Sequence, residues 1–263
     1  MKITDFQRKK ERREKISMLT CYDYPSARMI ADTSIDCILV GDTLAMVVHG
    51  FANTTFATMD MMVLHTEAVA RGKGLQLLVC DLPFLCHRFS RAQTVENCKR
   101  LLLAGAAAIK IEGADADTCQ TIAYLVQAGL PIMGHIGLTP QSIYQLGQYK
   151  VQGKQAAEAQ QLIDQAHALQ AAGCFAVVIE CVPESLAKTI SRALTIPTIG
   201  IGAGIETDGQ VLVWHDMLGL QDEMHPKFVK QYIQLKPSIQ AAINHYAQQV
   251  VALQFPSKEH AYL

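Results

Sequence analysis

The sequence carries little net charge and no long apolar run, and each of these absences excludes a class of protein. Its 23 basic and 24 acidic residues leave a formal net charge of −1, so bulk charge does not favour binding to nucleic acid or to a membrane surface. No apolar segment reaches the roughly 20 residues that cross a bilayer. The polar start, MKITDFQRKKERREK, lacks the apolar core of a secretory signal. We therefore expect a cytoplasmic protein without nucleic-acid or membrane partners.

The eight cysteines form no C-x-x-C pair, so neither a structural zinc site nor a catalytic thiol is favoured. Free cysteine behaves as a small hydrophobic residue in protein cores. Four of the cysteines lie within or beside apolar segments, namely Cys21, Cys37, Cys80 and Cys181. A reduced protein is the simplest account of this distribution.

What the sequence does contain is a series of short apolar segments, most of which end in a polar residue. The segments are MLTCYD to Asp23, ILVGD to Asp42, LLVCD to Asp81, AIKIEG with Lys110 and Glu112, IMGHIG with His135, AVVIEC with Glu180, IGIGAG and VLVWHD to Asp216. Helical stretches separate most of them, and this alternation indicates parallel strands joined by right-handed crossovers. A doubly wound sheet shares the alternation. Eight segments in 263 residues favour a (β/α)8 TIM barrel, as one domain over residues 1–263 with an N-terminal helical extension.

The segment boundaries give more detailed expectations. The helix near 60–72 is expected to begin with Asp60 as its N-cap, and Gly105 is expected just after the end of the helix at 91–104. The glycines at 200–204 predict a turn that brings the backbone close to a substrate. The predicted strands are 17–23, 37–42, 75–82, 108–112, 131–136, 176–181, 197–201 and about 211–215, and a final helix is predicted over 226–252.

Three carboxylates, Asp42, Asp81 and Glu112, come from three consecutive strand ends. The carboxyl ends of barrel strands meet on one face, where the active sites of such enzymes lie. Clustered carboxylates repel one another unless a hard divalent cation lies between them, and Mg²⁺ prefers few carboxylates plus water and substrate oxygens. The cluster therefore predicts an open magnesium site. For any single aspartate, capping of the next helix is the alternative.

Lys110 and Glu112 are two residues apart on one strand, so both side chains point to the same face. Lys110 beside a metal cluster suits a substrate carboxylate, and a structural Lys110–Glu112 ion pair is the alternative. His135 near a strand end is expected to contact the substrate rather than to be a satisfied core histidine.

Glu180 follows the apolar run AVVI. A carboxylate in apolar surroundings can act as a general base, and we assign it that role. The alternative is a salt bridge with Lys188 or Arg192. The 17-residue segment 137–153 is long enough for a functional loop.

Several stretches, in this order, resemble the ketopantoate hydroxymethyltransferase family over nearly the whole chain. Among them the combination of DLPF, KIEG, GHIGLTPQS and IGIGAG with TDGQ is highly specific. The matching stretches include TCYDYPSA (20–27), LVGDTLAMVVHG (39–50), DLPF (81–84), AGAAAIKIEG (104–113), PIMGHIGLTPQS (131–142), IECVP (179–183), IPTIGIGAG (196–204) and TDGQVLV (207–213).

The resemblance implies a (β/α)8 barrel enzyme that binds one Mg²⁺ ion and works as a large homo-oligomer, a decamer. It implies transfer of a hydroxymethyl group from 5,10-methylenetetrahydrofolate to the α-keto acid 3-methyl-2-oxobutanoate, which gives 2-dehydropantoate for pantothenate and coenzyme A. The resemblance implies that Asp42 and Asp81 are metal ligands and that Glu112 belongs to the metal site directly or through water. It implies that the substrate contacts are Asp42, Thr43, Asp81 and Lys110, with Tyr22 and His135 in the same pocket. It implies that Glu180 is the base.

The chain departs from the family at a few positions. It reads D-T-L-A at 42–45 where D-S-L-G is usual, and Ala45 would be harmful if that position needed positive φ. Segment 219–226 reads GLQDEMHP where the family is glycine-rich. Two alternatives stay open: a magnesium-dependent α-keto acid lyase or mutase on the same barrel, although its K-x-C-G motif is missing, and a diverged barrel that binds a keto acid without catalysis.

Overall fold

A computed structural model describes residues 1–221 and 226–262, and the chain forms two compact units, Met1–Leu212 and Val213–Leu263. The first unit is a closed barrel of eight parallel strands that pair in chain order, with β8 against β1, as predicted. One domain spanning 1–263 stays a prediction. The strands are β1 (Ile16–Thr20), β2 (Cys37–Val40), β3 (Leu77–Asp81), β4 (Ala108–Glu112), β5 (Ile132–Gly137), β6 (Ala176–Glu180), β7 (Thr198–Ile201) and β8 (Gly209–Leu212).

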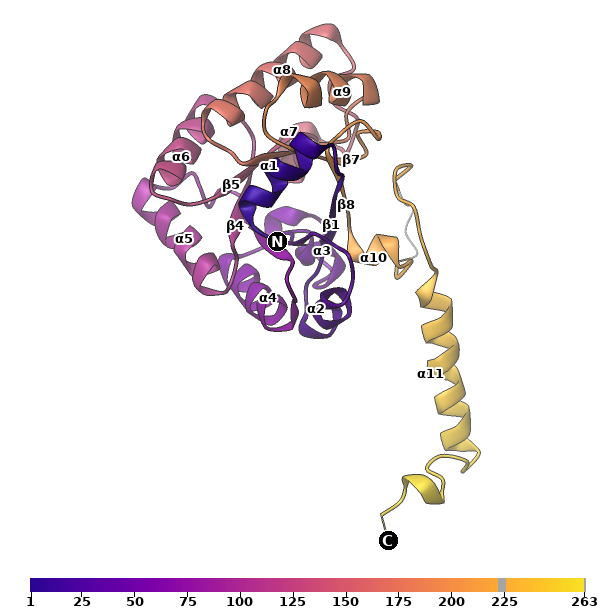
Figure 1. Ribbon diagram of the computed structural model, residues 1–263. Coiled ribbons are helices and arrows are strands. Elements are labelled where there is room, and N and C mark those ends of the chain that lie inside the picture. Colours follow the sequence, from indigo (N-terminus) through magenta and orange to yellow (C-terminus); the bar gives the residue numbers. More distant parts are fainter. Residues whose placement is uncertain (222–225, 263) are drawn as a thin grey trace. The chain divides into compact units, whose positions relative to one another are not determined.

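Helices surround the strands of the first unit (Figure 1). They are α1 (Ile3–Arg12), α2 (Tyr24–Ala31), α3 (Leu44–Val47), η1 (Thr54–Phe56), α4 (Met59–Gly72), α5 (Arg91–Leu103), α6 (Ala116–Gln127), η2 (Pro140–Ser142), α7 (Ile143–Leu146), α8 (Ala156–Ala171) and α9 (Glu184–Ala193). The second unit holds α10 (Trp214–Met217), α11 (Leu235–Val251) and η3 (Lys258–His260). None of the described helices combines the length and apolar character that a membrane crossing requires.

Helix ends follow their local signals, with one correction. Gly105 has φ +110° and directly follows Ala104, the C-cap residue of α5, as predicted. The predicted N-cap Asp60 is wrong, because α4 begins at Met59 and the hydroxyl of Thr58 accepts from the N–H of Met61 at 3.2 Å. Threonine is also a favoured N-cap residue, and an aspartate within the first turn is stabilised by the helix dipole.

Two predictions near the carboxyl terminus are also wrong. Strand β8 ends at Leu212, because Gly209 already pairs with Ile16, so Asp216 lies on α10 and not at a strand end. Helix α11 begins at Leu235 rather than near 226. Pro237 explains this boundary: it lies in the first turn of α11, where no N–H is needed, whereas in a longer helix it would remove a hydrogen bond. Within segment 219–226, residues 222–225 lie outside the described residues.

Alternate residues of the strands fill the barrel with one buried apolar cluster. Ile16 of β1, Leu77 of β3 and Ala176 of β6 are the first residues of their strands, and all three belong to this cluster. Phe6 of α1 belongs to it as well, fully buried and 5.4 Å from the ring of Phe175. Helix α1 therefore closes the amino-terminal end of the barrel, which is the predicted N-terminal extension.

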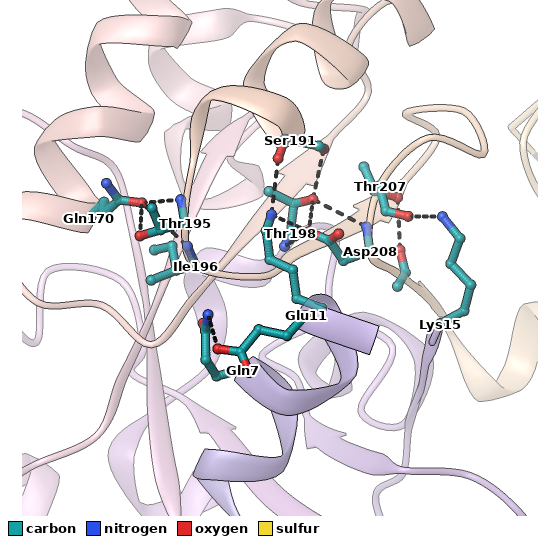
Figure 2. Close-up of polar contacts among 12 residues, drawn as sticks. Gln7, Glu11, Lys15, Gln170, Ser191, Thr195, Ile196, Thr198, Thr207 and Asp208 are labelled. Carbon is teal, nitrogen blue, oxygen red and sulfur yellow. Dashed lines mark hydrogen bonds and ion pairs between the residues drawn. The ribbon is translucent and has the colours of Figure 1, made fainter. Parts of the chain in front are cut away.

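Polar contacts complete this closure. Asp208 accepts from the backbone N–H and the hydroxyl of Thr198 at 2.9 and 3.0 Å, and Thr198 contacts Ser191 at 2.7 Å (Figure 2). Lys10 of α1 lies 2.8 Å from Asp208. The amino-terminal end is thus filled by paired groups, which leaves the opposite end for a site.

All eight cysteines are free thiols. Cys37 is fully buried in the apolar cluster of the barrel. Burial raises the pKa of Cys98 to about 12, so this thiol stays protonated and acts as a core group. Of the four cysteines expected within or beside apolar segments, Cys21, Cys37 and Cys80 are buried and Cys181 is half-buried, and a reduced protein stays a prediction.

Candidate active site

The inward-facing positions change from apolar to charged toward the carboxyl ends of the strands. On β3, Leu77 and Val79 are followed by Asp81, and on β6, Ala176 and Val178 are followed by Glu180. The strand pairing places Asp81 opposite Lys110, Glu112 opposite His135, and Glu180 opposite Gly137. Barrel closure therefore gathers the predicted residues of four strands at one end.

Asp42 and Asp81 form the anionic side of this cluster. The backbone N–H of Asp42, just beyond β2, donates to Asp81 Oδ2 at 3.1 Å, and both side chains are buried. Burial, together with the charges of Asp81 and Glu112, raises the pKa of Asp42 well above its ordinary value. Burial also raises the pKa of Asp81, although Lys110 opposes this. Neither aspartate caps a helix through its side chain, so that alternative is wrong for both.

Lys110 provides the buried cation of the cluster. Its Nζ lies 2.8 Å from Asp81 Oδ1 and 3.7 Å from Glu112 Oε1. Burial alone would lower the pKa of Lys110, but the charges of Asp81, Glu112 and Asp42 outweigh it and raise the pKa above the ordinary value. The ammonium is therefore permanently charged, and its closest partner is Asp81 rather than the Glu112 of the structural-pair alternative.

His135 connects two carboxylates. Its Nδ1 lies 3.2 Å from Glu112 Oε1, and its Nε2 lies 3.3 Å from Glu180 Oε2. Burial and the charge of Lys110 would lower the pKa of His135, but Glu112 and the contact with Glu180 raise it to about 9. An imidazolium therefore stands between Glu112 and Glu180 at neutral pH.

Glu180 is the most accessible carboxylate of the cluster, with 15% of its side chain exposed. Its surroundings are not wholly apolar, because His135 contacts it. The salt-bridge alternative is wrong, since Lys188 and Arg192 both pair with Glu206. The next residue, Cys181, has φ +48°, a strained conformation that fixes the turn immediately after this carboxylate.

Gly137 explains how the backbone reaches Glu180. It has φ +92°, and a Cβ at this position would lie 2.2 Å from the carbonyl oxygen of Glu180. A glycine is therefore required for β5 and β6 to end so close together. The glycines at 200–204 have a different role from the one predicted. Gly204 packs on Glu184 and Gly200 on Thr207, so their close approaches are to protein groups.

Tyr22 and Thr43 form a hydroxyl pair on the β1–β2 side of the site. Tyr22 Oη lies 2.7 Å from Thr43 Oγ1, and the carbonyl of Tyr22 contacts His65 Nδ1 at 2.5 Å. Burial raises the pKa of Tyr22, so the phenol is neutral. Thr43 directly follows Asp42, which places this pair beside the acidic cluster. Ala45 lies in α3 and has no positive φ, so alanine fits where the family has glycine.

One buried residue of the site, Gln141, was missed by reasoning from the sequence. Its Nε2 donates to Asp42 Oδ2 at 2.8 Å and to the Leu82 carbonyl at 3.0 Å. Its backbone N–H donates to Glu112 Oε2 at 3.0 Å. The available signal was its place in GLTPQS directly after β5, but a glutamine in a loop has no intrinsic chemistry that singles it out.

The donor set fits one Mg²⁺ ion held by few protein ligands. Among the described residues, no three His, Cys, Asp or Glu side chains form a metal-binding group. Asp42 and Asp81 are nevertheless adjacent, buried and oxygen-only, and burial raises the pKa of both carboxyl groups. Two carboxylates with the remaining positions left to water and substrate is the arrangement that Mg²⁺ favours. Glu112 already accepts from Gln141 and contacts His135.

Comparison with known proteins shows which family this chain belongs to. A profile of the family described as ketopantoate hydroxymethyltransferase matches residues 1–258. A 3-methyl-2-oxobutanoate hydroxymethyltransferase of Legionella pneumophila (strain Lens) is 64% identical over 262 residues, which is 100% of both chains. Proteins of the same name from Bdellovibrio bacteriovorus and Coxiella burnetii (strain Dugway 5J108-111) are 49% and 47% identical, over 99% and 100% of this chain and 98% and 99% of their own.

Solved structures share the fold at low sequence identity. A phosphoenolpyruvate phosphomutase from Streptomyces platensis subsp. rosaceus has a TM-score of 0.64 and 13% identity, covering 100% of this chain and 92% of that one. A 2,3-dimethylmalate lyase has a TM-score of 0.60 and 14% identity, covering 98% and 91%. Full-length identity of this level to the named relatives, together with the family match, shows that the chain belongs to the ketopantoate hydroxymethyltransferase family and is an enzyme of the hydroxymethyltransferase type.

Proposed function

We propose that the protein transfers a hydroxymethyl group from 5,10-methylenetetrahydrofolate to 3-methyl-2-oxobutanoate and forms 2-dehydropantoate, a precursor of pantothenate and coenzyme A. The observation that carries this proposal is the buried arrangement of Asp42, Asp81, Lys110, His135 and Glu180 at one barrel end. It combines an oxygen site for a metal, a fixed cation for a carboxylate and an accessible base.

The keto acid would bind between the aspartates and Glu180. Lys110, charged and already 2.8 Å from Asp81, would bind the substrate carboxylate or the negative charge that develops on the enolate. The hydroxyl of Thr43, held by Tyr22, would donate a further hydrogen bond. Asp42 and Asp81 would hold Mg²⁺, which when bound supplies Lewis-acid polarisation of the keto group and makes the proton on C3 more acidic.

Glu180 would remove the proton from C3, and the electron pair of the broken C–H bond would pass into the enolate. His135, as an imidazolium 3.3 Å from Glu180 Oε2, would fix the orientation of the base. Water would add to the methylene carbon of the folate, which breaks its two bonds to nitrogen and gives tetrahydrofolate and formaldehyde. The enolate carbon would then form a bond to the carbon of formaldehyde, and the proton held by Glu180 balances the charge on the oxygen that becomes the new hydroxyl.

The cellular setting belongs to the same proposal. Eight free thiols suit a reducing compartment, which supports a cytoplasmic enzyme. The family resemblance supports a large homo-oligomer, a decamer. Light scattering coupled to size-exclusion chromatography measures the oligomer directly.

The decisive experiment follows exchange of the C3 hydrogen of 3-methyl-2-oxobutanoate for deuterium by NMR, with Mg²⁺ and without folate. We expect exchange that requires Mg²⁺ and disappears in Glu180→Gln. Glu206→Gln is the matched control, because Glu206 pairs with Lys188 outside the site and its loss should leave exchange unchanged.

Three results would count against the proposal. Exchange that persists in Glu180→Gln would remove the base assignment. A folded protein that binds the keto acid but neither exchanges it nor turns it over with methylenetetrahydrofolate would be a binding barrel. Cleavage of a carbon–carbon bond in place of addition would point to a lyase.

A further inference from the structure

A cavity lies beside the buried charged cluster, next to the proposed keto acid subsite. Its volume is about 300 Å³, and it lies where β3, β4 and β5 end. It shares Glu112 and Gln141 with the cluster, whereas Asp42, Lys110 and Glu180 do not line it. Its other walls include Phe84, Leu85, Arg88, Asp115 and Tyr144. The volume is at the lower limit of small-molecule sites, roughly 300–1,000 Å³, so it suits a ring system rather than a whole folate.

We propose that this cavity binds the pterin ring of the reduced folate; the inference rests on the proposed function and adds the location of its second substrate. The walls supply flat apolar surface that is otherwise exposed. Leu85 is 46% exposed and Tyr144 is 69% exposed. Leu85 also has φ +61°, a conformation that is strained for a non-glycine residue and that is found mainly at functional sites. A planar heteroaromatic ring would cover both side chains.

The polar walls match the edge of a pterin. This ring presents adjacent N–H and NH₂ donors on one edge and a carbonyl acceptor next to them. Asp115 is not available for these donors, because its two oxygens already accept from both Nη atoms of Arg88 and from the N–H and hydroxyl of Thr118. The exposed side chain of Gln145 on the cavity wall carries an amide oxygen that accepts from such a donor. Arg88 and the amide of Gln145 offer donors to the ring carbonyl.

The position of the cavity suits delivery of the one-carbon unit. Gln141 separates it from Asp42 by a single side chain, with the amide 2.8 Å from the carboxylate. Glu112 separates it from Glu180 through His135, over contacts of 3.2 and 3.3 Å. A folate bound here would therefore present its methylene carbon from the β4–β5 side, opposite the Tyr22–Thr43 pair that faces the keto acid.

A second cavity, next to the first, indicates where the rest of the folate would lie. It has a volume of about 100 Å³, shares His87 and Arg88 with the first and adds Arg91. Asp117 also lines it and pairs with Arg88 at 3.1 Å. Arg91 lies 5.1 Å from the centre of the Tyr124 ring. We place the aminobenzoyl-glutamate tail along this path, where the guanidinium of Arg91 meets its carboxylates.

The test separates folate binding from keto acid chemistry. Binding of tetrahydrofolate to the full-length protein is measured by calorimetry, and C3 exchange of the keto acid is measured without folate in the same samples. Tyr144→Ala and Leu85→Ala remove exposed walls, and Tyr24→Ala is the matched control, since this aromatic residue is 48% exposed and does not line the cavity. We expect the dissociation constant to rise about ten-fold in both wall variants, as loss of a stacking surface commonly causes, with exchange unchanged.

Each other result overturns the assignment. Unchanged tetrahydrofolate affinity in both wall variants, with normal exchange in the wild type, would refute the cavity while leaving the proposed function intact. Equal weakening by Tyr24→Ala would show that the effect is not local. A wild type that neither exchanges the keto acid nor binds tetrahydrofolate would refute the proposed function itself. Arg91→Ala gives an independent measurement: it should weaken binding of p-aminobenzoyl-glutamate and leave binding of a free pterin unchanged.

Discussion

Both ends of the barrel carry aspartates, but the aspartates differ in whether their charges are paired with nearby cations and donors. At the amino-terminal end, Asp208 accepts from Thr198 twice and pairs with Lys10, and Asp36 accepts from Ser17 and pairs with Lys9 at 2.7 Å. At the carboxyl end, Asp42 is buried among other carboxylates and accepts from the neutral amide of Gln141.

This difference indicates that the amino-terminal end of the barrel contributes stability, whereas the carboxyl end holds the candidate site. Paired carboxylates at the amino-terminal end attach α1 to the strands. Burial, followed by the charges of Asp81 and Glu112, raises the pKa of Asp42, so its ionised form lowers stability at the carboxyl end. The same residue type thus has a structural role at one end and, in the proposed function, a chemical role at the other.

The largest expected effect comes from neutralising the functional aspartate. Asp42→Asn keeps the shape and an oxygen for Gln141 but removes a metal charge, so we expect the turnover rate to fall about 10²–10³-fold. Because the pKa of Asp42 is raised in the fold, its ionised form destabilises the metal-free protein at neutral pH, and the free energy of unfolding should rise in the variant. Activity assays and metal-free denaturant titration measure both. A loss of stability in the metal-free Asp42→Asn protein would contradict the contrast between the two barrel ends.

An effect of intermediate size is expected on the stability of the protein at acidic pH. Burial, followed by the charge of Arg88, lowers the pKa of His87 to about 4 from 6.5. Below pH 6.5 the unfolded chain takes up a proton that the folded chain does not, so stability should fall by about 3 kcal/mol between pH 6.5 and 4. His87→Gln should flatten this slope, and the exposed His167→Gln should not. Denaturant titrations across this range test it, and equal slopes in all three proteins would refute it.

The smallest effect tests the structural end. Asp208→Asn removes the partner of Lys10 and one strong acceptor for Thr198, so we expect the free energy of unfolding to fall by about 1–3 kcal/mol. The turnover rate of the folded fraction should not change, because α1 lies at the end away from the site. The same denaturant and activity assays apply. A large loss of turnover without loss of stability would show that the two ends are coupled.

Much of this molecule could be predicted from the printed residues. Strand order, barrel closure and the eight candidate site residues followed from apolar runs with polar ends and from the family resemblance. Local signals located most elements, and the two errors near the carboxyl terminus had local causes: an apolar run that continued past β8, and a proline whose first-turn position was not used.

Contacts between distant segments could not be predicted in the same way. The roles of Gln141, of the Cys181 turn and of Gly137 depend on groups from other strands. The pairing of Lys188 and Arg192 with Glu206 rather than Glu180 is a choice among neighbours that the chain order leaves open.

The order of residues by itself determined the strands, their parallel pairing and the end at which charged groups emerge, because side-chain alternation and strand polarity are local properties of the backbone. Only the tertiary structure decided which charges are compensated. Barrel closure sets the distances among Asp42, Lys110, His135 and Glu180, and electrostatic energy in a buried site depends on those distances and on access to water.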